Sequence, residues 1–504
     1  MLEYIRFLHE LNFTNQQERK LKSNATPIID ALKGKYLFID NELQDGIQRL
    51  GLFGILSRQG LGKRSGEKIP QLIFAVLIWP FLKVDSISSF CGKMAGNFYA
   101  GGKDVLYRFL RREDINWRAI CFSVSKAAYD RHALGAGSDA AFVVDDTLKH
   151  RRGKKVEGVS SHFDHTECRH VLGQQVLQLG HVSPKGFLPV FQQIYIGRKK
   201  VQELREAFKD NRSSVAKDYK TAIEKDKNEM LRSMLKKAVR QGMKAAHLLG
   251  DSWFGNKGNI RTALELGISA IFMMKRGNLS YRFQGRTYTA KMLYMLVKRR
   301  MKAAPGQRFL THGIQVEIDL STDGKTPEWV QVKLLFSKPR QANNDTWVVL
   351  LCTDIAYSPE RILSIYALRW SIEVYFKEVK QSMGWMKEQS GRYTTHYASI
   401  HLAAIRYLLI YSLMLDDGRL KFGEMRNRIT GAIEQLGFAA VLWEFFKALL
   451  NGVLDTFLNI LGADVLARIK TAIGTTIDDF LSAALQADNE SVCAQLKAKQ
   501  LRVL

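Results

Sequence analysis

Cysteine and proline are scarce in this sequence, with five cysteines and nine prolines among 504 residues. No two cysteines have the C-x2-C spacing, which excludes a disulfide scaffold and a zinc ribbon or finger and favours a reduced, cytoplasmic setting. The longest apolar run, residues 72–82, is interrupted by a proline, and a membrane-spanning helix needs roughly 20 apolar residues. The N-terminus carries two early acids and no long apolar core. We therefore expect no signal peptide and no membrane partner.

Acidic residues are also in short supply: 49 Asp and Glu stand against 75 Lys and Arg, so the formal net charge is +26. A charge this high favours a polyanionic partner, and without a membrane span nucleic acid is the simpler expectation. A basic protein without such a partner stays the alternative. Hydrophobic residues make up 46% of the chain, which excludes disorder throughout and suffices for two to four domains.

The pattern of apolar and turn residues divides the chain into five regions. The central part alternates β-branched strand patterns with helical ones in an α/β order, and a run of turn-separated strands interrupts it. A helix is expected from 359 to about 382, because Ser358 suits an N-cap and Pro359 the first helical position. The expected regions are a basic helical region at 1–134, an α/β core at 135–276, a β-rich insertion at 277–352, the second part of the core at 353–415 and a helical region at 416–504.

Two acids lie where apolar strand patterns end, Asp145 after 140–144 and Asp251 after 245–250. The carboxyl ends of parallel strands meet at one edge of a sheet, where α/β folds build their sites. Two carboxylates there repel each other unless a cation lies between them, and Mg²⁺ suits such ligands. Asp146 is adjacent, and only one of the two neighbours can face the site. The alternative for each acid is a cap on the following turn.

Four polar residues of the expected helix share one face. Tyr366, Arg369, Glu373 and Lys380 fall within an arc of roughly 60° at 100° per residue. A carboxylate flanked by Arg and Lys suits a metal ligand beside a phosphodiester. The alternative is a solvated face with an ordinary Arg369–Glu373 ion pair.

Together these motifs resemble a known family. Asp145 in VVDDT, Asp251 in LLGDSWFG and Glu373 in YALRWSIEVYFKEVK resemble the DDE transposases of bacterial insertion sequences, over about residues 140–415. The last motif keeps every spacing of the signature Y-x2-R-x3-E-x6-K, which is typical of the group named for insertion sequence four. The D-x-T register favours Asp145 over Asp146 as the first ligand.

The resemblance implies an α/β fold with a ribonuclease-H-like core, a β-rich insertion between the second Asp and the Glu, and helical N-terminal and C-terminal domains. It implies two Mg²⁺ ions, with Mn²⁺ as a substitute, at Asp145, Asp251 and Glu373. It further implies cleavage of transposon ends, joining of the 3′-OH to target DNA, a homodimer on double-stranded DNA with terminal inverted repeats, and work in the bacterial cytoplasm at the nucleoid. Tyr366, Arg369 and Lys380 would handle the DNA strand. A catalytically idle DNA-binding protein and a nuclease without strand transfer are the alternatives.

Other features are weaker signals. The basic residues Lys149, Arg151 and Arg152, followed by Lys154 and Lys155, suit phosphates beside the site or a solvated charge run. A second dense group could bind zinc, although its spacing fits no common pattern and a loop near DNA is the simpler interpretation: His162, His165, Cys168 and His170. Trp329 and Trp347 favour core packing over holding a flipped base. The apolar run 441–454 indicates a dimer interface.

Overall fold

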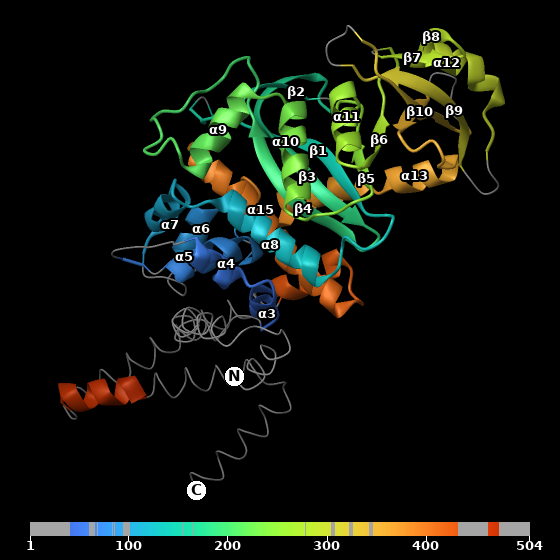
Figure 1. Ribbon diagram of the computed structural model, residues 1–504. Coiled ribbons are helices and arrows are strands. Elements are labelled where there is room, and N and C mark those ends of the chain that lie inside the picture. Colours follow the sequence, from blue (N-terminus) through green and yellow to red (C-terminus); the bar gives the residue numbers. More distant parts are fainter. Residues whose placement is uncertain are drawn as a thin grey trace. The chain divides into compact units, whose positions relative to one another are not determined.

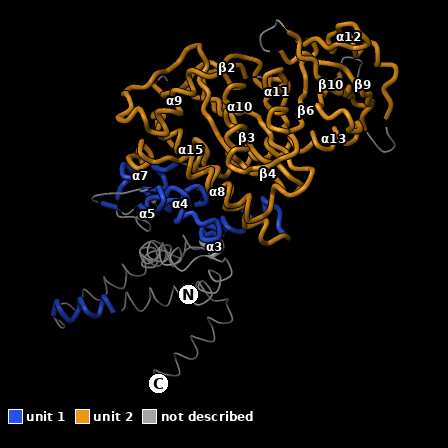
Figure 2. The backbone as a smooth tube through the Cα atoms, in the orientation of Figure 1, with its two compact units in different colours: residues 1–106, 419–504 blue, residues 107–418 orange. Residues whose placement is uncertain are grey.

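The computed structural model describes most of the chain between residues 41 and 431, and a short segment beyond it (Figure 1). The described residues are 41–59, 66–67, 69–82, 84, 86–93, 101–153, 155–164, 166–277, 279–303, 308–321, 326–341, 346–431 and 462–472. The chain forms two compact units, one of residues 1–106 with 419–504 and one of residues 107–418 (Figure 2). The apolar run 441–454 lies outside the described residues.

The described N-terminal part of the first unit is helical, as the sequence predicts. The apolar segment ends in a short 3₁₀ helix that contains Pro80. The α-helix stops there because proline has no N–H to continue it. The helices are α3 Asn41–Arg49, α4 Leu52–Arg58, α5 Ile69–Ile78, η1 Trp79–Leu82, α6 Ile87–Lys93 and α7 Lys103–Leu110, which reaches into the second unit.

The second unit is mixed α/β and is built on one eleven-stranded sheet. The strand order is β2-β3-β1-β5-β6-β11-β10-β9-β7-β8, and β4 pairs with β3 outside this path. The strands are β1 Ala141–His150, β2 Ser160–Asp164, β3 Arg169–Ser183, β4 Gly186–Tyr195, β5 His247–Gly250, β6 Ser269–Met273, β7 Ser280–Phe283, β8 Arg286–Thr289, β9 Phe309–Asp319, β10 Trp329–Pro339 and β11 Val348–Cys352.

The half of the sheet that carries the candidate site combines two kinds of pairing. β1 is antiparallel to β3, and β3 is antiparallel to β4. On its other side β1 is parallel to β5, and β5 is parallel to β6. The helices packed on this part are α8 Trp117–Arg131, α9 Ser214–Glu224, α10 Lys227–Arg240, α11 Lys257–Glu265, α14 Trp370–Ser382 and α15 Tyr393–Asp417.

The expected β-rich insertion does not form a separate sheet. β11 pairs antiparallel with β6, so the strands of residues 277–352 extend the same sheet. Trp347 is buried and stacks on Tyr294 of α12 Ala290–Val297 with ring centroids 4.1 Å apart, which confirms core packing for this tryptophan. A short 3₁₀ turn, η3 Lys298–Arg300, follows α12.

The helix expected over 359–382 is two helices. α13 Pro359–Ala367 is capped by the Ser358 hydroxyl, as expected, but it ends before Arg369, and α14 starts at Trp370. Between them the Leu368 and Arg369 N–H groups donate to carbonyls three residues back, at 3.0 Å each, which is the pattern of a 3₁₀ turn. The single helix expected over 359–382 is therefore interrupted between Ala367 and Trp370.

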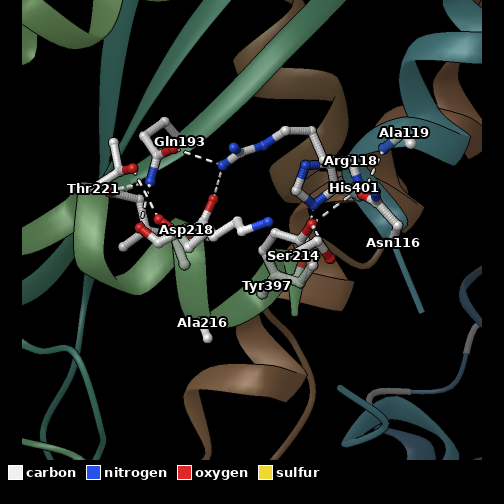
Figure 3. A network of polar contacts seen from close by, with 12 residues as sticks. Asn116, Arg118, Ala119, Gln193, Ser214, Ala216, Asp218, Thr221, Tyr397 and His401 are labelled. Atoms are coloured by element: carbon white, nitrogen blue, oxygen red, sulfur yellow. Dashed lines mark hydrogen bonds and ion pairs between the residues drawn. The ribbon is translucent and has the colours of Figure 1, made fainter. Parts of the chain in front are cut away.

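Helix α8 lies within the region expected to be the N-terminal helical domain, yet it belongs to the second unit. It packs on β4 and on α15. A buried polar network joins these elements (Figure 3): Arg118 of α8 contacts Gln193 of β4 and forms an ion pair with Asp218 of α9. Asp218 is fully buried, so this pair ties three elements together around a charge that needs its partner.

Among the described helices, α15 alone is long and apolar enough to cross a membrane by length and composition. Its residues from Tyr393 to Leu413 are almost all buried inside the protein. Polar side chains lie among them. Arg406 and His396, for example, form hydrogen bonds with neighbouring groups of the protein. These features are those of a core helix.

Candidate active site

Asp145 lies inside strand β1, not at its end as the sequence pattern suggested. β1 continues to His150 because β3 keeps pairing with it, whereas the parallel ladder with β5 stops at the pair Val144 and Gly250. Asp145 is the next residue of β1, and Asp251 directly follows the end of β5. Neighbouring strands lie about 4.8 Å apart, so the two carboxylates start from adjacent positions at the edge of the parallel ladder.

Glu373 comes to the same place from helix α14, which packs on β1 and β4. Arg369 connects the acids: its Nη1 lies 2.7 Å from Asp145 Oδ2 and 3.5 Å from Glu373 Oε1. The Glu373 side chain is 40% exposed, whereas the Asp145 side chain is only 13% exposed. The three predicted carboxylates thus lie within electrostatic range of one another, from β1, from the residue after β5 and from α14.

The electrostatics of this group favour a bound cation. Burial raises the pKa of Asp145 to about 8, and the charge of Asp251 adds to the rise. The Arg369 guanidinium opposes it, and Glu373 and Asp146 raise it further. One guanidinium therefore does not balance the acids, and the all-oxygen donor set with its excess negative charge fits a hard divalent ion such as Mg²⁺.

Asp146 points elsewhere, as the alternation of side chains along a strand requires. It accepts hydrogen bonds from the Lys227 ammonium at 2.7 Å and from the Gln175 amide. The structure therefore places Asp145, not Asp146, beside Arg369 and the other two acids.

The remaining residues of the Tyr-Arg-Glu-Lys spacing surround the carboxylates. Tyr366 donates a long hydrogen bond of 3.4 Å to the Gly250 carbonyl, and burial raises its pKa to about 12. Lys380 donates to the Leu148 carbonyl at 3.4 Å, farther along β1.

The basic run after Asp145 splits into different environments. Arg151 donates from Nε to the Gln174 amide oxygen at 3.0 Å, and burial lowers its pKa. Lys149 is half-buried, and burial also lowers its pKa. Arg152 is exposed, and Lys154 lies outside the described residues. Of the three predicted DNA-binding residues in this run, Arg152 is thus the one on the open surface.

The His and Cys residues of 162–170, whose number in a short segment suggested a zinc site, have separate surroundings where the structure describes them. His162 is buried against the Ser160 hydroxyl at 2.8 Å, and His170 packs edge-on against Phe163. His165 lies outside the described residues, and Cys168 is exposed.

Sequence reasoning missed another set of possible ligands. Among the described residues, His150, Asp164 and Glu167 have ligand atoms within 4.8 Å of one another. His150 Nε2 lies 2.5 Å from Asp164 Oδ2, which is also the geometry of an ion pair. The pairing of β1 with β2 through β3 creates this group, and no sequence spacing signals it.

Two family models match this chain. The model described as DDE superfamily endonuclease matches residues 89–292, and the model described as transposase DDE domain matches residues 209–409. Transposase DDE domains are present in this chain. Asp145 lies in the first match, Glu373 in the second and Asp251 in both, so the transposase DDE matches span all three carboxylates.

Similarity to solved structures is more distant. The Drosophila P element transposase strand transfer complex is 12% identical with a TM-score of 0.21. The similarity covers 56% of this chain and 57% of that chain, which is less than two thirds of its length. No curated protein matches.

Proposed function

We propose that this protein is an active transposase of the group named for insertion sequence four, with the Tyr-Arg-Glu-Lys signature. It cleaves the ends of its transposon and joins the freed 3′-OH to target DNA by phosphoryl transfer. The observation that carries the proposal is the convergence of Asp145, Asp251 and Glu373 around Arg369. The transposase DDE matches support the same class of enzyme.

In this proposal Asp145, Asp251 and Glu373 hold two Mg²⁺ ions, for which Mn²⁺ substitutes. When bound, such ions supply an activated nucleophile and stabilise the charge on the leaving oxygen. The chain's own residues orient the reaction. Arg369 holds the ligand carboxylates in place and offers its remaining N–H groups to a phosphate oxygen, as guanidinium groups do. Tyr366 and Lys380 fix the DNA strand on either side of the carboxylates.

The proposed partner is double-stranded DNA, both the terminal inverted repeats and the target. The net charge of +26 supports a polyanionic partner, and exposed Arg152 lies close to the site in sequence. We further propose that the enzyme works as a homodimer in the bacterial cytoplasm, associated with the nucleoid when bound to DNA.

The proposed domain functions follow the chain. Residues 1–134 carry the binding to the transposon end. Strands β4, β3, β1, β5 and β6 belong to a ribonuclease-H-like core, and residues 277–352 are its insertion. The support for this core is its mixed pairing. Strands β4, β3 and β1 pair antiparallel, whereas β1, β5 and β6 pair parallel, and two of the carboxylates lie where the parallel pairing of β1 with β5 ends.

The variant Glu373→Gln tests the function, because it removes the charge but keeps the size and helix propensity of the side chain. We expect end cleavage in Mg²⁺ to fall by at least about 1,000-fold, since loss of a ligand costs several kcal/mol of transition-state stabilisation. DNA binding in a gel shift should remain, because it depends on the spread positive charge.

The assay uses a duplex that carries the transposon end, with strand transfer into a plasmid measured alongside cleavage. A wild-type protein that binds the end without cutting it would indicate the idle DNA-binding alternative. Cleavage without joining would indicate a nuclease. Near wild-type cleavage by Glu373→Gln would contradict the assignment of the three carboxylates.

A further inference from the structure

Lys227 is a buried lysine whose position local helix chemistry does not explain. It is the first residue of α10, where Asp226 and Glu229 form a capping box. A cation at a helix N-terminus opposes the helix dipole. Its side chain is also buried, with the residue 8% exposed, and a buried ammonium is costly unless it is paired. The contacts of the ammonium must therefore account for the burial of Lys227.

The ammonium of Lys227 joins two segments that are far apart in the sequence. It donates to Asp146 Oδ2 at 2.7 Å, and it lies 4.2 Å from the ring centroid of Trp253. A cation over an indole ring is attracted by the negative face of the ring, most strongly when water is excluded. The Gln175 amide of β3 holds the same Asp146 carboxylate.

Both partners of Lys227 are directly connected to candidate ligands. Asp146 follows Asp145 in β1, and its N–H donates to the Asp145 carboxylate at 2.8 Å. The N–H of Trp253 donates to the Asp251 carboxylate at 2.9 Å. The Lys227 ammonium thus contacts both residues, Asp146 and Trp253, whose N–H groups hydrogen-bond to the two aspartate carboxylates.

We propose that Lys227 is a positioning residue, which braces Asp146 and Trp253 and so restrains the orientation of the Asp145 and Asp251 carboxylates for a divalent cation. This inference rests on the proposed function of the same site. Two carboxylates in adjacent positions repel each other before a cation arrives, and only the surrounding structure resists their separation. Partners of metal ligands that lie one contact away affect metal affinity by about 10- to 100-fold when they are removed.

The test compares Lys227→Met, which keeps the length of the stem but removes the charge, with Lys227→Arg, which retains a cation. Lys236→Met is the matched control, because Lys236 is on the same helix and pairs on the surface with Glu265. Each full-length variant is titrated with Mn²⁺ by calorimetry in the absence of DNA. Melting temperature, gel-shift binding to the transposon end and the Mg²⁺ concentration for half-maximal cleavage are measured in parallel.

We expect Lys227→Met to weaken Mn²⁺ binding by about 10-fold or more and to raise the Mg²⁺ midpoint by a similar factor, with DNA binding unchanged. Lys227→Arg should recover much of the loss, and Lys236→Met should behave as wild type. The double variant Lys227→Met with Asp146→Asn should be no worse than the Lys227→Met single variant, because the two groups act as a pair.

Unchanged Mn²⁺ affinity in a folded Lys227→Met protein would overturn the inference, as would fully additive losses in the double variant. If Lys227→Met does not fold, Asp146→Asn carries the test by the same Mn²⁺ titration, and wild-type affinity in Asp146→Asn would overturn it. A wild-type protein that binds Mn²⁺ but does not cut DNA would refute the proposed function alone. If the wild-type protein cleaves DNA and Lys227→Met binds Mn²⁺ as tightly as wild type does, the positioning role alone would be refuted.

Discussion

Replacing Asp145 by Asn should stabilise the metal-free protein, although it removes a proposed ligand. Burial and Asp251 raise the pKa of Asp145 from 3.8 to about 8. The folded state therefore holds the proton more tightly than the unfolded chain does. This group leaves stability unchanged below about pH 4 and lowers it progressively as the pH rises toward about 8. Asparagine keeps the shape and the hydrogen bond from the Asp146 N–H but carries no charge to bury.

The size of the effect follows from the pKa. Each pKa unit corresponds to about 1.4 kcal/mol, so at about pH 9 the ionised carboxyl costs the folded state about 6 kcal/mol, and at about pH 5 about 2 kcal/mol. For a unit of this size, a gain of 1 kcal/mol raises the melting temperature by about 2 °C. We expect Asp145→Asn to melt about 10 °C above wild type at the higher pH and only a few degrees above it at the lower one.

The assay is calorimetry of both proteins in a metal chelator across this pH range. Asp146→Asn is the control, because it leaves the buried Lys227 ammonium without its carboxylate and should lower the melting temperature. Added Mg²⁺ should stabilise wild type at high pH and leave Asp145→Asn nearly unaffected. An Asp145→Asn protein no more stable than wild type at about pH 9 would refute the electrostatic reasoning.

Two further substitutions test other parts of the structure. Arg118→Ala should lower the free energy of unfolding by about 3–5 kcal/mol in urea, because it leaves the fully buried Asp218 charge without its guanidinium; a loss below 1 kcal/mol would contradict the buried pair. Arg151→Ala should lower the free energy of unfolding, because it loses the contact to Gln174. Arg152→Ala should leave stability unchanged and weaken DNA binding in a salt-dependent way. Weaker DNA binding by Arg151→Ala, with binding by Arg152→Ala unchanged, would show that Arg151 faces the DNA.

Local sequence patterns were sufficient for much of the fold. Short apolar runs predicted the strands before Asp145 and Asp251, and the Ser358–Pro359 pair predicted the start of α13, because propensity and capping depend on neighbouring residues. The position of Asp251 directly after β5 was also predicted. The structure then brings it beside Asp145, since parallel pairing aligns Val144 with Gly250.

Only the tertiary structure decided features that depend on distant residues. β1 runs past Asp145 because β3 continues to pair with it, and residues 277–352 extend the main sheet because β11 finds a partner in β6. Arg151 turns inward because Gln174 of β3 receives it. Strand pairing is non-local, and the hydrophobic period of a segment carries no information about its partner.

The candidate site shows the same division. The sequence by itself determined which residue types are present and the spacing from Tyr366 to Lys380. The contacts of Lys227 with Asp146 and Trp253 came from the tertiary structure. A buried charge is stable only where folding brings it a partner, and that partner can be far away in the sequence.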